Sequence, residues 1–378
     1  MKIVIIGPAH PLRGGLASFN ERLAREFQQE QDDVTIDTFS FQYPNFIFPG
    51  TTQYSSEPAP QNLKINVCIN SVNPLNWLKV GRQLKKRKPD IIVVRYWLPL
   101  MGPCLGSILR IVRKNKHTRI ICIADNVLPH EKRPGDKPFT SYFVKAVDAF
   151  ITMSESVMND LRLFTQKPAQ LVVHPLYDNF GAIVDKTTAR NHLSLDQEAR
   201  IILFFGFIRK YKGLDILFDA MKRLQQDPAT ADIKLLVAGE FYGDKEAYHE
   251  QIKKLGIEAQ LLLHTDFITD SEVKYYLSAS DFVIQPYRDA TQSGVTPLAY
   301  HFEKPMLVTN VGALPDLVPD GKVGLVAEPD AESIATRIKE LYQLGEDYFL
   351  AHLRAEKPKY SWHTLVATIK QLAAGIKK

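Results

Sequence analysis

The sequence predicts an α/β protein built from two doubly wound, parallel-sheet domains. Short apolar runs without polar alternation recur along the chain, as is typical of parallel strands that helices cover on both faces. These runs alternate with segments that carry apolar residues at helical spacing. The alternation occurs as two separate series, interrupted by a polar segment at residues 185–198, which indicates two consecutive domains.

The first series begins with a predicted strand at residues 2–7 and a turn rich in Pro and Gly. A helix follows, because Leu16, Phe19, Leu23 and Phe27 recur at helical spacing. Further strands are predicted at residues 34–39, 65–69, 91–97, 120–125, 150–153 and 171–174, with helices at 75–86 and 105–113. Residues 43–60, rich in Pro, Ser, Thr and aromatics, predict a long loop.

The second series predicts strands at residues 201–205, 234–238, 261–264, 282–285, 306–309 and 324–327. We therefore expect an N-terminal Rossmann-like domain over residues 1–186 and a C-terminal one over 187–356. The last stretch, residues 361–378, is amphipathic and basic. It predicts a helix that docks on the protein, with association with a membrane surface as the alternative.

Composition excludes several classes of protein. With 45% hydrophobic and 24% charged residues in 378, the chain is neither disordered nor collagen-like. Its net charge of +5 is too small for a nucleic-acid binder recognisable by charge, so we expect no nucleic-acid partner. Cys68, Cys104 and Cys122 have no metal-ligand spacing and are expected to be buried thiols in a reducing compartment. No apolar run resembles a signal peptide or a membrane span, which predicts a cytoplasmic protein.

Ligands of open parallel sheets bind at the carboxyl ends of the strands, so the strand-to-helix turns hold the candidate residues. The first turn contains Gly14 and Gly15 directly ahead of a helix, where backbone N–H groups and the helix dipole attract an anion. The turn matches neither the dinucleotide fingerprint nor a Walker A loop. A tight turn without a ligand is the alternative.

Two turns of the second series carry stronger signals. The turn after residues 201–205 contains Gly206, Arg209, Lys210 and Lys212, whose cations suit a shared anion, and a diphosphate is the natural candidate. A solvated basic surface is the alternative. The turn after residues 282–285 offers hydroxyl, amide and backbone donors ahead of a helix, which predicts a second anion pocket. Its candidate residues are Asp289, Thr291, Gln292, Ser293, Gly294, Val295 and Thr296.

In the first series, Asp125, Asn126 and His130 follow the strand at residues 120–124. A carboxylate, an amide and an imidazole on one loop suit hydroxyl recognition and proton transfer. Asp125 is the stronger catalytic candidate because it ends the strand directly, whereas a lone histidine on a loop is more often structural. Trp97, together with the aromatic loop at residues 42–54, offers a stacking face for a sugar.

Taken together, these motifs resemble the retaining, nucleotide-sugar-dependent glycosyltransferases of the GT-B fold, in particular the bacterial family related to sucrose synthase and mannosyltransferases (glycosyltransferase family 4). The resemblance covers nearly the whole chain. Residues 204–213 are similar to the family signature in which Arg and Lys hold the donor diphosphate, and Gly14 and Gly15 to its N-terminal glycine loop. Residues 238–240, 304–305, 308–309 and 312 follow in the family's order, and Ser361 and Trp362 stand where a final helix, residues 357–378, crosses back onto the first domain.

The resemblance implies two Rossmann-like domains facing across a cleft. It implies transfer of a sugar from a nucleoside-diphosphate-sugar to an acceptor hydroxyl with retention, in bacterial polysaccharide or glycoconjugate biosynthesis. The first domain would bind a glycan or lipid-linked acceptor through Trp97 and Asn126, with peripheral contact at the inner face of the membrane as an option. Arg209 and Lys212 would neutralise the diphosphate without a metal or another cofactor, since the chain contains no Asp-x-Asp element.

The chain departs from the family at two places. Relatives often have two glutamates eight residues apart, and neither register of residues 290–299 holds such a pair. Glu240 or Asp289 is then expected to contact the donor ribose. Many relatives have His where this chain has Asp125, so the contact with the sugar falls to Asp125 or His130. A non-catalytic protein that binds sugar nucleotides or glycans, and a nucleotide-sugar epimerase, stay as alternatives.

Overall fold

The chain divides into two compact units. The computed structural model describes residues 1–43, 52–128, 134–243, 245–290 and 293–377. Unit 1 comprises residues 1–175 and 361–378, and unit 2 comprises residues 176–360. The first stretch of unit 1 therefore ends at Pro175, whereas the boundary predicted from the sequence lies at residue 186. The C-terminal segment belongs to unit 1 from Ser361 onward.

Unit 1 is built on a sheet in which, over the described residues, seven strands pair in parallel in the order β3-β2-β1-β4-β5-β6-β7. The strands are β1 (Lys2–Ile6), β2 (Asp33–Phe41), β3 (Ile65–Asn70), β4 (Ile91–Tyr96), β5 (Arg119–Ala124), β6 (Ala149–Thr152) and β7 (Ala169–Leu171). The last strand lies earlier than the predicted 171–174, because its ladder begins where Ala169 pairs with Phe150 of β6.

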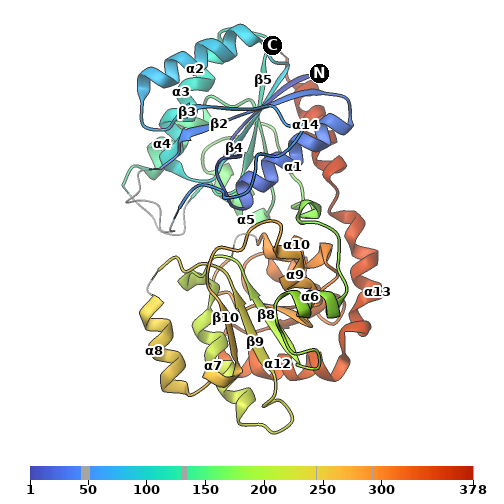
Figure 1. Ribbon diagram of the computed structural model, residues 1–378. Coiled ribbons are helices and arrows are strands. Elements are labelled where there is room, and N and C mark those ends of the chain that lie inside the picture. Colours follow the sequence, from blue (N-terminus) through green and yellow to red (C-terminus); the bar gives the residue numbers. More distant parts are fainter. Residues whose placement is uncertain (44–51, 129–133, 244, 291–292, 378) are drawn as a thin grey trace. The chain divides into compact units, whose positions relative to one another are not determined.

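Helices cover both faces of this sheet, with α1 and α14 on one side and α2 and α3 on the other (Figure 1). Central strands are consequently buried on both faces: every residue of β4 is buried. The unit 1 helices are α1 (Gly15–Gln29), α2 (Pro74–Arg87), α3 (Gly102–Arg113), α4 (Asp136–Val144), α5 (Glu155–Arg162) and α14 (Trp362–Gly375). The three cysteines are free thiols of this unit, and burial raises the pKa of Cys68 and of Cys104 to about 12.

Unit 2 repeats the architecture with six parallel strands among its described residues, in the order β10-β9-β8-β11-β12-β13. They are β8 (Ile201–Phe205), β9 (Lys234–Ala238), β10 (Leu261–His264), β11 (Phe282–Gln285), β12 (Met306–Thr309) and β13 (Gly324–Ala327), which confirms the predicted ranges. The helices are α6 (Lys186–His192), α7 (Leu214–Gln225), α8 (Lys245–Leu255), α9 (Val273–Ala279), α10 (Val295–His301), α11 (Leu314–Leu317), α12 (Ala331–Leu344) and α13 (Glu346–Glu356). The two parallel sheets with helices are the predicted α/β, doubly wound class.

The C-terminal helix α14 packs on unit 1 through its apolar face. Ser361 caps the helix by accepting a hydrogen bond from the backbone N–H of Thr364. Trp362 is buried with its ring centroid 4.7 Å from that of Phe19, and Ile369 is fully buried. The docking helix predicted for residues 361–378 is therefore present, and it buries the apolar face that a membrane would need.

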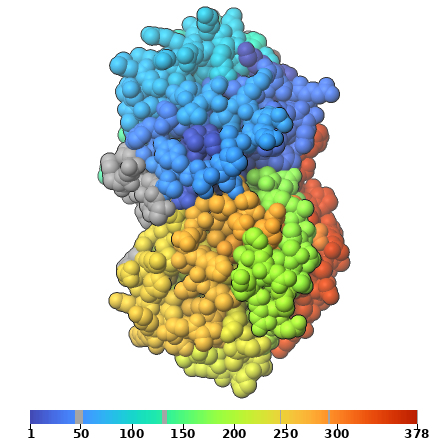
Figure 2. All heavy atoms as spheres, viewed as in Figure 1, coloured from blue at the N-terminus to red at the C-terminus, as the bar shows by residue number. Residues whose placement is uncertain are grey.

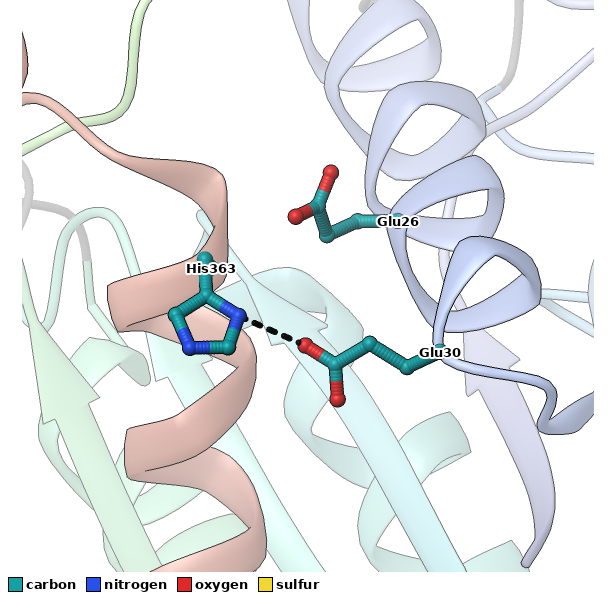
Figure 3. Close-up of side chains that lie close together, drawn as sticks. All are labelled: Glu26, Glu30 and His363. Atoms are coloured by element: carbon teal, nitrogen blue, oxygen red, sulfur yellow. Dashed lines mark hydrogen bonds and ion pairs between the residues drawn. The ribbon is translucent and has the colours of Figure 1, made fainter.

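Charged side chains border the contact between α1 and α14 (Figure 3). The potential ligand atoms of Glu26, Glu30 and His363 lie within 4.8 Å of one another, an arrangement that can hold a metal ion. Cations already pair with both carboxylates, since Arg22 bonds to Glu26 at 2.8 Å and Lys370 to Glu30 at 2.7 Å. The cluster is thus an ion-pair network that joins the two helices.

Replacing Ile369 with alanine should destabilise unit 1 by about 2–5 kcal/mol, because it opens a cavity under α14. The exposed neighbour Gln371→Ala is the control and should change stability by less than about 0.5 kcal/mol. All three tryptophans (Trp77, Trp97 and Trp362) belong to unit 1, so urea unfolding followed by tryptophan fluorescence reports on this unit. Equal midpoints for the two variants would show that α14 does not stabilise the unit.

Candidate functional site

The carboxyl ends of β8 and β11 in unit 2 are joined by unusually close backbone contacts. The N–H of Arg288 donates to the carbonyl of Tyr211 at 2.7 Å. Gly213 has φ of 68°, and a Cβ there would lie 1.9 Å from the carbonyl oxygen of Pro286. Only glycine fits at this position, for both reasons. The turn after β8 is therefore held tightly against the turn after β11.

Lys212 lies inside this junction. It ends the short helix η3 (Lys210–Lys212), and only 8% of its surface is exposed. Its ammonium nitrogen is 5.7 Å from the ring centroid of Tyr287, and it makes no hydrogen bond or ion pair with any described residue. Burial, and secondly repulsion from Arg209, lower the pKa of Lys212 to about 7. A buried lysine without a carboxylate is costly, which indicates a site completed by an anionic ligand.

Arg209 precedes Lys212 on the same turn. Its side chain is exposed, with the guanidinium carbon 5.1 Å from the ring centroid of Tyr242, and among the described residues it has no carboxylate partner. Tyr242 in turn stacks on Phe207 with 4.3 Å between centroids. The structure thus brings the two predicted cations together, and no acidic residue among those described pairs with either of them. Lys210 between them is exposed.

The end of β9 packs directly against the same turn. Gly239 has φ of 145°, and a Cβ there would lie 2.3 Å from the carbonyl oxygen of Gly206. The N–H of Ile208 donates to the carbonyl of Glu240 at 2.8 Å, and the Glu240 side chain is buried. The structure therefore places two predicted donor-binding residues, Gly206 and Glu240, beside the Arg209 turn. The third candidate of this group, Asp289, is exposed after β11.

The predicted anion pocket ahead of α10 has a different internal arrangement. The hydroxyls of Ser293 and Thr296 both donate to the side-chain carbonyl of Gln285, at 2.7 and 3.1 Å. Ser293 also accepts from the N–H of Val295 at 3.1 Å, and Gly294 is the exposed residue at the start of the helix. In this structure both hydroxyls are hydrogen-bonded to Gln285, so they do not line an open ligand position. The two other predicted members of this turn, Thr291 and Gln292, lie outside the described residues.

Sequence reasoning missed Gln285, which is the hub of this arrangement. Gln285 is the last residue of β11, and it is only 1% exposed. Its amide nitrogen has no hydrogen-bond partner among the described residues. Its polar type within an otherwise apolar strand, FVIQ, was the available signal. Because this buried amide accepts hydrogen bonds from two hydroxyls, it fixes the start of α10 relative to the sheet.

A pocket of about 400 Å³ lies at the end of β10 and was also missed. It is lined by residues 263–269 together with Glu272 and Tyr276. His264 bonds to the hydroxyl of Tyr276 at 2.9 Å, and burial lowers the pKa of the imidazole. Phe267 joins the pocket to the Arg209 turn, because its ring centroid is 6.3 Å from that of Phe207. The polar run that follows the strand, TDFITDSE, could have indicated it.

In unit 1, Asp125 directly follows β5 as predicted, but it is buried and paired. Arg95 of β4 binds its carboxylate with two hydrogen bonds of 2.5 Å, and both side chains are nearly fully buried. The guanidinium also lies 3.8 Å from the ring centroid of Phe19. Arg95 was not recognised from the sequence, because its partner follows a different strand. The pair fixes the position of the Asp125 carboxylate at the end of β5.

The other unit 1 candidates lie on nearby segments. Trp97 is half-buried against the core, with its ring centroid 5.9 Å from that of Phe39 and its indole N–H bonded to the hydroxyl of Tyr43. Asn126 follows Asp125 and is partly exposed. Gly14, with φ of 100°, and Gly15 stand at the N-terminus of α1, which has no side-chain cap. His130 lies outside the described residues.

The unfolding free energy of the protein should rise between about pH 7 and pH 9 relative to that of Lys212→Met. Because the folded-state pKa is about 7 and an exposed lysine has 10.5, the unfolded chain binds more protons in this window. The expected difference is about 2 kcal/mol, measured by urea unfolding followed by circular dichroism. Lys210→Met, which removes the exposed neighbour, should show no such relative change. Parallel pH profiles for the wild type and Lys212→Met would contradict a depressed pKa.

Gln285→Leu and Ser293→Ala should each destabilise unit 2 by about 1–3 kcal/mol. The first removes the acceptor of the Ser293 and Thr296 hydroxyls, and the second removes a donor to Gln285 and the acceptor of the Val295 N–H. The double variant should lose less than the two single losses added together, with a coupling of about 0.5–3 kcal/mol. Calorimetric unfolding of the four proteins measures it. Simple additivity would mean that the bond between Ser293 and Gln285 does not stabilise the start of α10.

Comparison with known proteins accounts for both units. Residues 13–176 match the family model described as "Glycosyltransferase Family 4", and residues 199–344 match the one described as "Glycosyl transferases group 1". An uncharacterized glycosyltransferase of Methanocaldococcus jannaschii is 23% identical over 98% of this chain and 97% of its own length. D-inositol 3-phosphate glycosyltransferase of Rhodococcus jostii is 30% identical, but the match spans only 48% of this chain and 41% of that relative.

Solved structures share the fold over the whole length. HepE from Anabaena, in complex with UDP and glucose, superposes with a TM-score of 0.76 at 14% identity and covers 100% of both chains. Sucrose-phosphate synthase from Thermosynechococcus elongatus gives 0.74 at 16% identity over 98% of both chains. Two family models that between them span most of the chain, and two parallel sheets of this topology, agree: the chain belongs to the family 4-like glycosyltransferases of the GT-B fold.

Proposed function

We propose that this protein transfers a sugar from a nucleoside-diphosphate-sugar to an acceptor hydroxyl with retention of anomeric configuration. The observation that carries the proposal is Lys212, a buried lysine at the carboxyl end of a parallel sheet that has no carboxylate partner among the described residues. With Arg209 it forms a cationic position suited to two phosphate groups. A diphosphate there would restore the charge of Lys212, because a nearby anion favours the ammonium form.

The pocket at the end of β10 is the proposed position of the nucleoside. Its size and mixed lining suit a base and ribose, and the stacked rings of Phe207 and Phe267 connect it to the cationic turn. Glu240, buried beside this turn, is the proposed partner of the ribose hydroxyls. A uracil base is favoured because one structural neighbour, HepE from Anabaena, has been solved in complex with UDP-glucose and with UDP.

The proposed role of unit 2 in catalysis is to stabilise the negative charge of the leaving group. The bond between the anomeric carbon and the phosphate oxygen breaks, and the acceptor oxygen bonds to the anomeric carbon on the same face. The leaving diphosphate takes the acceptor proton, so no general base, metal or other cofactor is required. Arg209 and Lys212 act mainly as negative charge builds on the diphosphate, and they should therefore contribute to kcat.

Unit 1 is the proposed acceptor unit. Trp97 offers a partly exposed aromatic face and Asn126 an amide for a glycan or lipid-linked glycan, as in polysaccharide or glycoconjugate synthesis. Asp125 is proposed to contact the sugar while Arg95 holds its orientation, and His130 to support it. No helix in the described part of the chain is long and apolar enough to cross a bilayer.

Arg209→Ala and Lys212→Ala should each lower kcat/KM for the sugar nucleotide by at least about 2 kcal/mol, or roughly thirtyfold. Each substitution removes a cation that stabilises the negative charge of the leaving diphosphate. The exposed Lys210→Ala is the matched control and should keep near-normal activity. Release of nucleoside diphosphate from a panel of sugar nucleotides, with and without glycan acceptors, measures the rates.

The same assay separates the alternatives. Binding of a nucleoside diphosphate without any turnover would favour a non-catalytic binding protein, and isomerised donor without transfer would favour an epimerase. An inverted anomer in the product, read by NMR, would refute retention. Activity lost in EDTA and restored by Mn²⁺ would refute the metal-free mechanism.

A further inference from the structure

Exposed aromatic side chains occur where helix α4 of unit 1 packs on its neighbours. Phe139 and Tyr142 of α4 are 37% and 38% exposed, and Leu100 on the short helix η1 (Pro99–Met101) is 39% exposed. Phe139 and Tyr142 are three residues apart on the helix, so they lie on the same face. Because η1 packs on α4, the three side chains form a patch, and such patches mark binding surfaces. We call Leu100, Phe139 and Tyr142 the α4 platform.

Two glycines of α3 let α4 approach closely. A Cβ at Gly102 would lie 2.5 Å from the carbonyl oxygen of Phe139, and a Cβ at Gly106 would lie 2.8 Å from Cδ1 of Tyr142. A side chain at either position would therefore displace α4 from α3. Figure 1 shows the two helices side by side, and the light-blue and cyan segment that includes α2 and α3 lies at the surface of unit 1 in Figure 2.

The ring of Tyr142 is held in one orientation. The guanidinium carbon of Arg110 lies 3.6 Å from the ring centroid, so it covers one face of the ring. Arg110 also donates to the carbonyl of Tyr142 at 2.6 Å and to that of Gly106 at 3.0 Å. The Tyr142 hydroxyl lies 3.0 Å from that of Ser107. The exposed area of Tyr142 therefore belongs to its other face and its edge, and a ligand that stacks there orders little that is not already ordered.

The α4 platform combines flat apolar surfaces with the hydroxyls of Tyr142 and Ser107 at its edge. One face of a pyranose ring carries mostly C–H groups while its edge carries hydroxyls, so a sugar matches both parts of this surface. A stable protein partner buries about 1,200–2,000 Å² in all, which is more than three partly exposed side chains supply. The chemistry of the platform therefore favours a sugar over a protein.

The platform is continuous with the proposed acceptor face. Trp97 directly follows β4 and stands two residues before η1, which in turn packs on α4. Helix α4 starts beyond the carboxyl end of β5 and runs back along the sheet, as helices between parallel strands do. Tyr142 consequently lies about one helical turn farther from the carboxyl edge of the sheet than Phe139. The aromatic side chains thus lead away from the edge at which Trp97 lies.

We propose that the α4 platform binds a distal sugar residue of an oligosaccharide acceptor. This inference rests on the proposed function, and it narrows the acceptor to a glycan of several sugar residues. A sugar residue on the platform is remote from the reacting hydroxyl, so its contacts are the same in the ground state and the transition state. Such contacts lower KM for the acceptor and leave kcat unchanged.

The first test measures binding of the full chain to immobilised oligosaccharides of glucose, galactose and mannose of increasing length, without donor. Stacking depends on the C–H face of a sugar rather than on its identity, so these probes suffice. The wild type should bind the longer chains. Phe139→Ala combined with Tyr142→Ala should lower the affinity by about tenfold, whereas Tyr142→Phe, which keeps the ring, should retain it within about threefold.

The matched control is Tyr348→Ala, which removes a tyrosine of unit 2 that is 51% exposed. It should bind oligosaccharides like the wild type, and circular dichroism should show that every variant is folded. Unchanged affinity in the double variant would overturn the proposal. So would a wild type that retains none of the oligosaccharides, or a concentration-dependent dimer that the double variant abolishes.

A second measurement separates this inference from the proposed function. Release of nucleoside diphosphate without an acceptor reports on the donor site, and its absence in the wild type would count against the proposed function while the binding test still decides the platform. With oligosaccharide acceptors, the double variant should raise KM for the longer chains by about tenfold at unchanged kcat. The KM of the shortest acceptor should stay the same. An equal rise in KM for short and long acceptors would overturn the distal position of the platform.

Discussion

The contact of Gly213 with the carbonyl of Pro286 is the constraint on which the unit 2 site depends. It lets the turn after β8 approach the turn after β11 closely enough to enclose Lys212 between them. Any side chain at this position would separate the two turns and expose the lysine to water. The lowered pKa of Lys212 and its position over Gly206 follow from that approach, and no carboxylate among the described residues offsets its charge.

The two units bury cations in opposite ways. Arg95 in unit 1 is matched by Asp125 through two hydrogen bonds, so its charge is neutralised within the fold. Lys212 in unit 2 is buried to a similar degree and has no such partner among the described residues. A paired buried cation stabilises an arrangement, whereas an unpaired one stores unfavourable free energy that a ligand can release. The contrast supports assigning the anion to unit 2.

The sequence predicted the fold well because parallel strands are buried on both faces and therefore appear as continuous apolar runs. All six strand ranges of unit 2 agree with the structure, whereas β7, a three-residue strand at the sheet edge, was placed too late. The Arg209 and Lys212 turn was found because its charges are consecutive in sequence. Gln285, Arg95 and the pocket after β10 were missed because their significance comes from partners on other elements or from an empty volume. The polar glutamine in FVIQ and the polar run after β10 mark these positions in the sequence but do not identify their partners.

The pairing of Arg95 with Asp125 has a consequence for how such chains can diverge. A neutral residue at position 125 leaves a buried guanidinium without its counter-charge, and a neutral residue at 95 leaves the carboxylate in the same state. Either single exchange is penalised, while a joint exchange to two uncharged, hydrogen-bonded side chains is tolerated. Positions 95 and 125 are therefore expected to change together in evolution. Relatives with histidine at position 125 are expected to have a residue other than arginine at position 95.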